Sequence, residues 1–220
     1  MLISYSHRFI FIHIYKVAGS SVRWALREHA HQPDRVLANR LLRKVGMDIA
    51  LPFRKCEEFP AHMKARDIRE ELPPKVYDKF YKFAFVRNPW DWQVSLYHFM
   101  LENTSHLQHE LAKSMSGFDE YMEWRVTEDK HLQKDFVTDE NGIQIVDFVG
   151  RYERLSDDFQ HVCRALGISA SLPHVNRSSH GDYRSHYDYR TIKMVEEHFK
   201  EDIEFFGYTF DPQGLDHARL

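Results

Sequence analysis

Short apolar runs alternate along this chain with longer stretches that have helical periodicity. Residues 9–15 form an apolar run without polar alternation, which is typical of a strand covered on both faces in a parallel sheet. Residues 81–86, with the sequence Tyr-Lys-Phe-Ala-Phe-Val, predict a second strand, and residues 143–149 predict a third. An Asn141-Gly142 turn signal precedes the third strand.

Helices are predicted between and after these strands. We expect them at residues 20–30, 35–45, 67–72, 89–101, 117–124, 129–137, 156–166 and 189–205. Asn88 can cap the fourth helix, where Pro89 takes the first position, and Gly167 closes the seventh. Strands that alternate with helices predict an α/β fold, with a P-loop-like central parallel sheet flanked by helices. The length of 220 residues suits one domain over residues 1–220.

Charge and composition exclude some classes of partner. The chain has 30 basic and 33 acidic residues, a net charge of −3, so no global field attracts nucleic acid. Residues 35–55 hold six basic residues and one acidic residue, Asp48. That segment could face an anionic substrate, although a solvated helix face is the favoured interpretation.

The cysteines and the apolar runs bear on the compartment. Cys56 and Cys163 lie far apart and have no metal or redox spacing, which fits a reducing compartment. Residues 1–15 predict a strand and not a signal peptide. No run approaches the roughly 18 apolar residues of a membrane span. We therefore expect a cytoplasmic protein without a membrane span.

A phosphate-holding loop is predicted directly after the first strand. Residues 11–22 read Phe-Ile-His-Ile-Tyr-Lys-Val-Ala-Gly-Ser-Ser-Val. A helix that begins at Ser20 or Ser21 directs backbone N–H groups at an anion, Gly19 allows close approach, and Lys16 adds a positive charge. In a Walker A loop the lysine follows the second glycine, whereas here it precedes the glycine as K-x-x-G-S-S.

A second anion site is predicted after the second strand. Arg87 leaves that strand beside a helix N-terminus, and Ser95 lies two helical turns beyond Asn88 on the same helix face. An arginine fork together with a hydroxyl group can bind an anion. A structural ion pair of Arg87 and a surface position for Ser95 are the alternatives.

Together the two segments resemble the signature segments of sulfotransferases that use 3′-phosphoadenosine 5′-phosphosulfate (PAPS). The resemblance implies that Lys16, Gly19, Ser20, Ser21 and Val22 hold the 5′-phosphosulfate. It implies that Arg87 and Ser95 hold the 3′-phosphate. The sequence Phe-Val-Arg-Asn-Pro-Trp-Asp resembles the corresponding segment of the carbohydrate branch of this family, which includes heparan 2-O- and chondroitin 4-O-sulfotransferases. The resemblance continues through residues 149–155 and 172–178, so it spans nearly the whole chain.

The resemblance implies further contacts and an acceptor class. Tyr152 matches a tyrosine near the adenine, and Arg177 and Ser179 lie in a loop that closes over the nucleotide in this family. Burial of Tyr152 in the core and a solvated loop at residues 176–184 are the alternatives. The expected product is adenosine 3′,5′-bisphosphate, no metal is expected, and the acceptor is a hydroxyl group, favoured to be on a glycan or glycoside.

Transfer needs a base that accepts the proton of the acceptor hydroxyl, and histidine suits neutral pH. His62 precedes the second segment in the stretch where the carbohydrate branch has its catalytic histidine. His13 is the alternative, because it lies three residues before Lys16. On a strand it shares a face with Phe9 and Phe11, which favours a packed core position. Lys16 is expected to neutralise the charge on the departing phosphate oxygen.

Two other functions stay open from the sequence. A P-loop kinase or NTPase is the first, because Asp147 ends an apolar run that resembles a Walker B strand. The missing Gly-Lys-Ser/Thr and the position of Asp147 within a predicted strand argue against it. The second is a nucleotide- or glycan-binding module without turnover.

Overall fold

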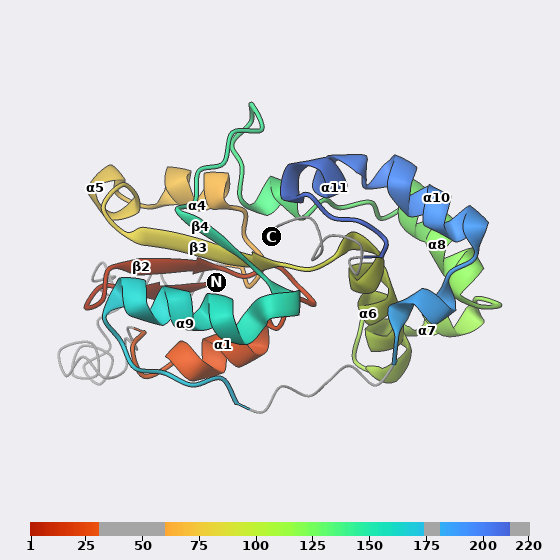
Figure 1. Cartoon of the computed structure of the whole chain (residues 1–220), viewed down its shortest axis with the longest axis horizontal. Coiled ribbons are helices and arrows are strands. Elements are labelled where there is room, and N and C mark those ends of the chain that lie inside the picture. The colour runs from red at the N-terminus through yellow and green to blue at the C-terminus, as the bar shows by residue number, and fades with distance from the viewer. Residues whose placement is uncertain (31–59, 174–180, 212–220) are drawn as a thin grey trace, which may run out of the picture. The chain divides into compact units, whose positions relative to one another are not determined.

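The computed structural model describes residues 1–30, 60–173 and 181–211. Two compact units are distinguished (Figure 1). The α/β unit is drawn from Met1–Phe85 and Phe136–Val175, and the helical unit from Val86–Asp135 and Asn176–Leu220. The predicted helix at residues 35–45, the basic segment 35–55 and Cys56 lie outside the described residues. The prediction of one domain over residues 1–220 stays a prediction.

The sheet has the strand order β1-β2-β3-β4. These strands are β1 (Leu2–Ser4), β2 (Phe9–Ile12), β3 (Tyr81–Val86) and β4 (Phe148–Arg151). β2 and β3 are parallel, with Phe11 opposite Phe83 and the two rings stacked at 5.2 Å. Every residue of β2 is fully buried, as its unbroken apolar run predicts. The α/β class is thus confirmed, and β3 has the bounds that the sequence predicts.

The sheet is mixed, whereas the sequence predicts a parallel one. β1 pairs antiparallel with β2, with Ser4 opposite Phe9. The turn between them has Arg8 in the left-handed region at φ 50°, and the Ser4 hydroxyl accepts the His7 N–H at 3.2 Å. A serine that bonds to nearby backbone favours a turn. The first 15 residues therefore form a hairpin in place of the single predicted strand.

Helices flank the sheet of the α/β unit. Figure 1 shows α4 (Ala65–Glu71) and α5 (Pro74–Tyr77) on one side of the strands, and α1 (Gly19–Leu26) and α9 (Leu155–Leu166) on the other. A short turn of 3-10 helix, Tyr152–Arg154, precedes α9. Gly167 ends α9 in the left-handed conformation at φ 62°, as predicted for a glycine at this position.

The third predicted strand is displaced along the chain. Residues 143–149 predict it, but the ladder residues are Phe148–Arg151. Gly142, at φ 76°, turns the preceding segment so that Thr138 bridges Gln144. Ile143 is left 62% exposed. The Asn-Gly turn is confirmed. The residues directly after it belong to this isolated bridge, and the chain joins the sheet only at Phe148.

The helical unit contains α6 (Pro89–Glu102), α7 (His109–Ser114), α8 (Phe118–Thr127), a 3-10 turn at Tyr183–His186, α10 (Tyr189–His198) and α11 (Lys200–Phe206). The Asn88 side chain accepts the Trp90 N–H at 3.0 Å, which confirms the predicted cap of α6. The predicted helix 189–205 is divided at Phe199, whose ring is fully buried beside Trp92.

The predicted helix at residues 129–137 is reduced to the 3-10 turn Lys134–Phe136. The carboxylate of Asp202 accepts the N–H groups of Gln133 and Lys134, each at 2.8 Å. These amides would be unpaired at the start of the turn, and a distant side chain pairs them. The long-range contact explains why the local pattern alone predicts the wrong element.

Asp202 should give the protein an unusual dependence of stability on pH. The residue is fully buried, and burial raises its pKa from 3.8 to about 7, although bonds from Gln133 and Lys134 lower it in part. The folded state then holds a proton that the unfolded chain releases near pH 4. The Asp202 contribution to the free energy of unfolding should therefore fall as pH rises from about 4 to about 7.

Urea unfolding across that pH range measures this contribution as the difference between the wild type and Asp202→Asn. We expect Asp202→Asn to lack this decrease in the free energy of unfolding with rising pH. Glu204→Gln, on the exposed face of α11, should have the same pH dependence as the wild type. Equal pH slopes for the wild type and Asp202→Asn would contradict a raised pKa at Asp202.

Candidate active site

The loop between β2 and α1 has the backbone shape of an anion cradle. Lys16 and Ala18 are in the left-handed region, at φ 62° and 63°, and Val17 between them is not. Alternating handedness turns successive N–H groups toward one side, which forms a nest for an anion. Ala18 is the N-cap of α1 and has no side-chain acceptor for the first amides of the helix. The loop therefore combines a nest with a helix N-terminus.

Gly19 is required by a neighbouring ring as well as by the loop. A Cβ atom at this position would lie 1.8 Å from Cδ2 and 2.0 Å from Nε2 of His13. His13 is 7% exposed, and its ring stacks on Phe11 at 5.9 Å. The predicted packed position of His13 is confirmed. The His13 ring packs directly against the loop between β2 and α1, and only a residue without a side chain fits against it.

His62 lies beside this ring. Its Nδ1 is 2.9 Å from the backbone oxygen of His13, and the two imidazole centroids are 4.6 Å apart. The Tyr15 ring contacts it from the loop at 5.7 Å. Because the carbonyl can only accept, Nδ1 carries the hydrogen and the lone pair of the neutral ring resides on Nε2. The structure thus brings the predicted base to the predicted phosphate loop.

The two histidines differ in their suitability as bases. Burial, together with smaller effects of the nearby His62 and Arg23, lowers the pKa of His13 to about 3. Nδ1 of His13 is buried without a hydrogen-bond partner. Partial burial also lowers the pKa of His62, and the bond to the His13 backbone raises it in part. His62 is exposed to solvent and neutral at pH 7, so it can accept a proton from a ligand.

The other predicted residues of the first segment occupy different environments. Lys16 and Ser21 are half-buried, Ser20 is exposed, and Val22 is fully buried. The Val22 N–H donates to the Ala18 carbonyl at 3.1 Å, which starts the helix. The phosphate contacts of these residues stay predictions.

In the helical unit, Arg87 is held by an ion pair. Its Nε and Nη2 donate to the two oxygens of Asp91 at 2.6 and 2.8 Å, and Arg87 is 3% exposed. Sequence reasoning missed Asp91, although its i,i+4 spacing from Arg87 is a signal for such a pair. The pair uses two of the five guanidinium N–H groups. Ser95 is 4% exposed on α6, and the anion contacts of both residues stay predictions.

The remaining predicted contacts are distributed over other segments. Tyr152 is half-buried in the 3-10 turn before α9. Arg177 and Ser179 lie outside the described residues.

Asp147 has a structural role that differs from that of a Walker B aspartate. Its carboxylate accepts the backbone N–H of Lys82 at 2.7 Å and lies 2.9 Å from the Lys82 ammonium. Lys82 is the second residue of β3, whereas the predicted phosphate loop follows the last residue of the parallel neighbour β2. Asp147 therefore lies toward the opposite end of the strands from the loop, which argues against a kinase-like metal site.

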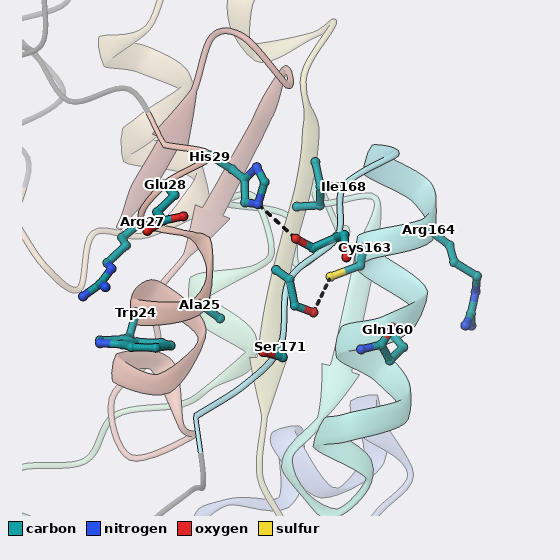
Figure 2. A pocket seen from close by; sticks show the side chains of 12 residues that line it. Trp24, Ala25, Arg27, Glu28, His29, Gln160, Cys163, Arg164, Ile168 and Ser171 are labelled. Carbon is teal, nitrogen blue, oxygen red and sulfur yellow. Dashed lines mark hydrogen bonds between the residues drawn. The ribbon is translucent and has the colours of Figure 1, made fainter.

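A cavity of about 520 Å³ lies elsewhere in the α/β unit. Figure 2 shows Trp24 from α1 and Arg27, the residue that caps this helix, on one side, and Gln160, Cys163 and Arg164 from α9 on the other. Its lining does not include Lys16, Gly19 or His62. The cavity is thus separate from the loop where the predicted catalytic groups gather.

Comparison with known proteins identifies the family. The model of the sulfotransferase family matches residues 1–209. This chain belongs to the sulfotransferase family. The chain is also 30% identical, over 126 residues, to an uncharacterized protein of Archaeoglobus fulgidus, which covers 56% of this chain and 98% of that protein.

A solved sulfotransferase has a similar fold. The crystal structure of mouse sulfotransferase SULT7A1 complexed with PAP matches with a TM-score of 0.54 and 14% identity, over 92% of this chain and 86% of that one. The expected sulfotransferase fold is therefore confirmed. No described helix combines the length and the apolar character needed to cross a membrane.

Proposed function

We propose that this sulfotransferase moves the sulfuryl group of PAPS to an acceptor hydroxyl, with His62 as the general base. The observation that carries the proposal is the 2.9 Å contact between His62 Nδ1 and the His13 carbonyl. With Nδ1 bonded there, the neutral ring has its basic lone pair on Nε2, and the ring lies 4.6 Å from that of His13, against which Gly19 packs. Membership of the sulfotransferase family and the PAP bound to the structural neighbour support the choice of donor.

The residues of the α/β unit have separate roles in this reaction. His62 Nε2 takes the proton as the acceptor oxygen forms a bond to sulfur and the bond from sulfur to the 5′-phosphate oxygen breaks. Lys16 neutralises the negative charge that grows on that departing oxygen. The loop amides, Ser20 and Ser21 hold the 5′-phosphate in line with the acceptor. Gly19 lets the loop lie against His13, so the base and the loop lie against the same residue.

Arg87 and Ser95 are proposed to bind the 3′-phosphate of the nucleotide. The carboxylate of Asp91 fixes one edge of the guanidinium. Arginine binds phosphate through N–H groups held in a planar fork, which gives it both charge and directed hydrogen bonds for this role. A 3′-phosphate distinguishes PAPS from ATP, so this site sets the nucleotide specificity.

We propose a carbohydrate hydroxyl as the acceptor, because the Phe-Val-Arg-Asn-Pro-Trp-Asp segment resembles the carbohydrate branch. Transfer of radiolabelled sulfate from PAPS to a panel of glycans, phenols and lipids tests this choice. We expect label in the glycans without added magnesium. Binding of the nucleotide without transfer to any acceptor would instead favour a binding module.

Calorimetry should show that adenosine 3′,5′-bisphosphate binds much more tightly than AMP or ATP. Loss of one charged hydrogen-bonding partner costs roughly 1.5 to 3 kcal/mol, so Arg87→Ala should weaken bisphosphate binding by about ten- to a hundredfold. Binding of AMP by the same variant should stay within about twofold of the wild type. Equal affinity of the wild type for AMP and the bisphosphate would overturn the 3′-phosphate site.

A further inference from the structure

Arg87 is held by its backbone as well as by its side chain. The side-chain amide of Gln133 accepts the Arg87 N–H through Oε1 at 2.9 Å and donates to the Arg87 carbonyl through Nε2 at 2.8 Å. Gln133 is fully buried. One side chain therefore pairs both backbone groups of the residue that follows β3, as a neighbouring strand would do.

Gln133 is itself anchored by Asp202. The Gln133 N–H and the Lys134 N–H donate to the two oxygens of Asp202, each at 2.8 Å. Asp202 is fully buried in α11. A continuous series of paired hydrogen bonds thus runs from Asp202 through Gln133 to the backbone of Arg87, and on from its guanidinium to Asp91.

We propose that Gln133, anchored by Asp202, is a positioning residue for the nucleotide's 3′-phosphate site at Arg87. This inference rests on the proposed function, in which Arg87 binds that phosphate. With its backbone fixed by Gln133 and its side chain fixed by Asp91, Arg87 holds its guanidinium in one orientation. Binding then costs little side-chain or backbone ordering, which is the benefit of preorganisation.

A purely structural role is the competing explanation, since buried backbone groups need partners in any protein. The two roles differ in what a variant does to ligand selectivity. A loss of folded protein lowers the apparent affinity for every nucleotide by the same factor. A misplaced arginine weakens the binding of the bisphosphate. It leaves the binding of AMP, which lacks a 3′-phosphate, almost unchanged.

Calorimetry with adenosine 3′,5′-bisphosphate and with AMP gives the selectivity as a ratio of affinities. Gln133→Met keeps the length of the side chain and removes both hydrogen bonds to Arg87. We expect the ratio to fall about tenfold in Gln133→Met. The double variant Arg87→Ala/Gln133→Met should have the same ratio as Arg87→Ala alone, because the two residues act as one unit. The control is Thr191→Val, which removes the fully buried hydroxyl of the α10 capping box and should preserve the ratio.

Gln133→Glu is a second variant that tests the same contact if Gln133→Met does not fold. A protonated carboxyl group has an acceptor and a donor as the amide does, whereas an ionised one repels the Arg87 carbonyl. The ratio of this variant, relative to the wild type at the same pH, should recover as pH falls from about 8 to about 6. Division by the wild-type ratio at each pH removes effects of the surrounding charged groups, Asp91, Asp202 and Lys134, and of the ligand, because these are common to both proteins.

The outcomes separate the two proposals. An unchanged ratio in both Gln133 variants, with a lowered ratio in Arg87→Ala, would overturn the positioning role and leave the 3′-phosphate site intact. An unchanged ratio in Arg87→Ala would overturn that site and this inference with it. A tenfold loss in Gln133→Met, with Thr191→Val like the wild type, supports both.

Discussion

Gly19→Ala should lower the free energy of unfolding by about 3 kcal/mol, at the upper end of the usual cost of overpacking. The added carbon would lie 1.8 Å from the His13 ring, far inside van der Waals contact. The ring cannot move away easily, because Phe11 stacks on it and the site is buried. The loop must shift instead, so bisphosphate binding should be lost as well. Urea unfolding and calorimetry measure the two effects.

Two further variants separate this clash from a general effect of alanine. His13→Ala/Gly19→Ala removes the ring and should recover part of the stability lost in Gly19→Ala. Gly117→Ala is a matched control, because no heavy atom lies within 4 Å of its added carbon. We expect it to cost less than about 1 kcal/mol, a typical value for an N-cap position. A double variant that is less stable than Gly19→Ala by the full cost of His13→Ala would refute the proposed clash.

Local signals determine the parts of the fold that the sequence predicts correctly. The run from Tyr81 to Val86 is followed by Arg87 and an Asn-Pro helix cap, and it forms a strand with the predicted bounds. Gly167 ends α9 because its backbone can adopt a positive φ. In such cases a few adjacent residues determine the conformation, so a single sequence is sufficient.

The incorrect predictions occur where distant residues decide the structure. Asp202 pairs the amides of Gln133 and Lys134 across more than 60 positions, and the predicted helix there is reduced to a 3-10 turn. The antiparallel pairing of β1 depends on a turn at Ser4 and Arg8 that the apolar pattern does not reveal. Such contacts have no local periodicity, so pattern reasoning does not find them.

The candidate site likewise has features that the local sequence predicts and features that depend on distant residues. The Lys16–Ser21 loop is predicted from its glycine and serines, and its backbone has the nest geometry that an anion needs. His62 is predicted from a resemblance, and the structure supplies the reason for its position, a bond to the His13 carbonyl. The close contact between Gly19 and the His13 ring cannot be predicted from the sequence and is visible only in the structure. The same holds for the hydrogen bonds from Gln133 to the backbone of Arg87, which lies 46 positions away in the sequence.

His62→Ala should lower the rate of sulfuryl transfer by about 10² to 10⁴, the usual contribution of a general base. The affinity for adenosine 3′,5′-bisphosphate should stay within about twofold of the wild type, since no phosphate contact is assigned to His62. Single-turnover transfer of radiolabelled sulfate and calorimetry measure the two quantities. His29→Ala is a suitable control, because His29 contacts the Ser169 backbone at the cavity and not the loop.

The pH profile tests the assignment of the base independently. The lowered pKa of His62 places its loss of a proton below about pH 6.5. The rate should therefore rise with pH in that region, level off near neutrality, and lose this rise in His62→Ala. Added imidazole should restore part of the rate by replacing the missing base. If His62→Ala instead turns over at the wild-type rate, another group accepts the proton. The deeply buried His13, with a pKa of about 3, is a poor candidate for that role, because its lone pair has little affinity for a proton.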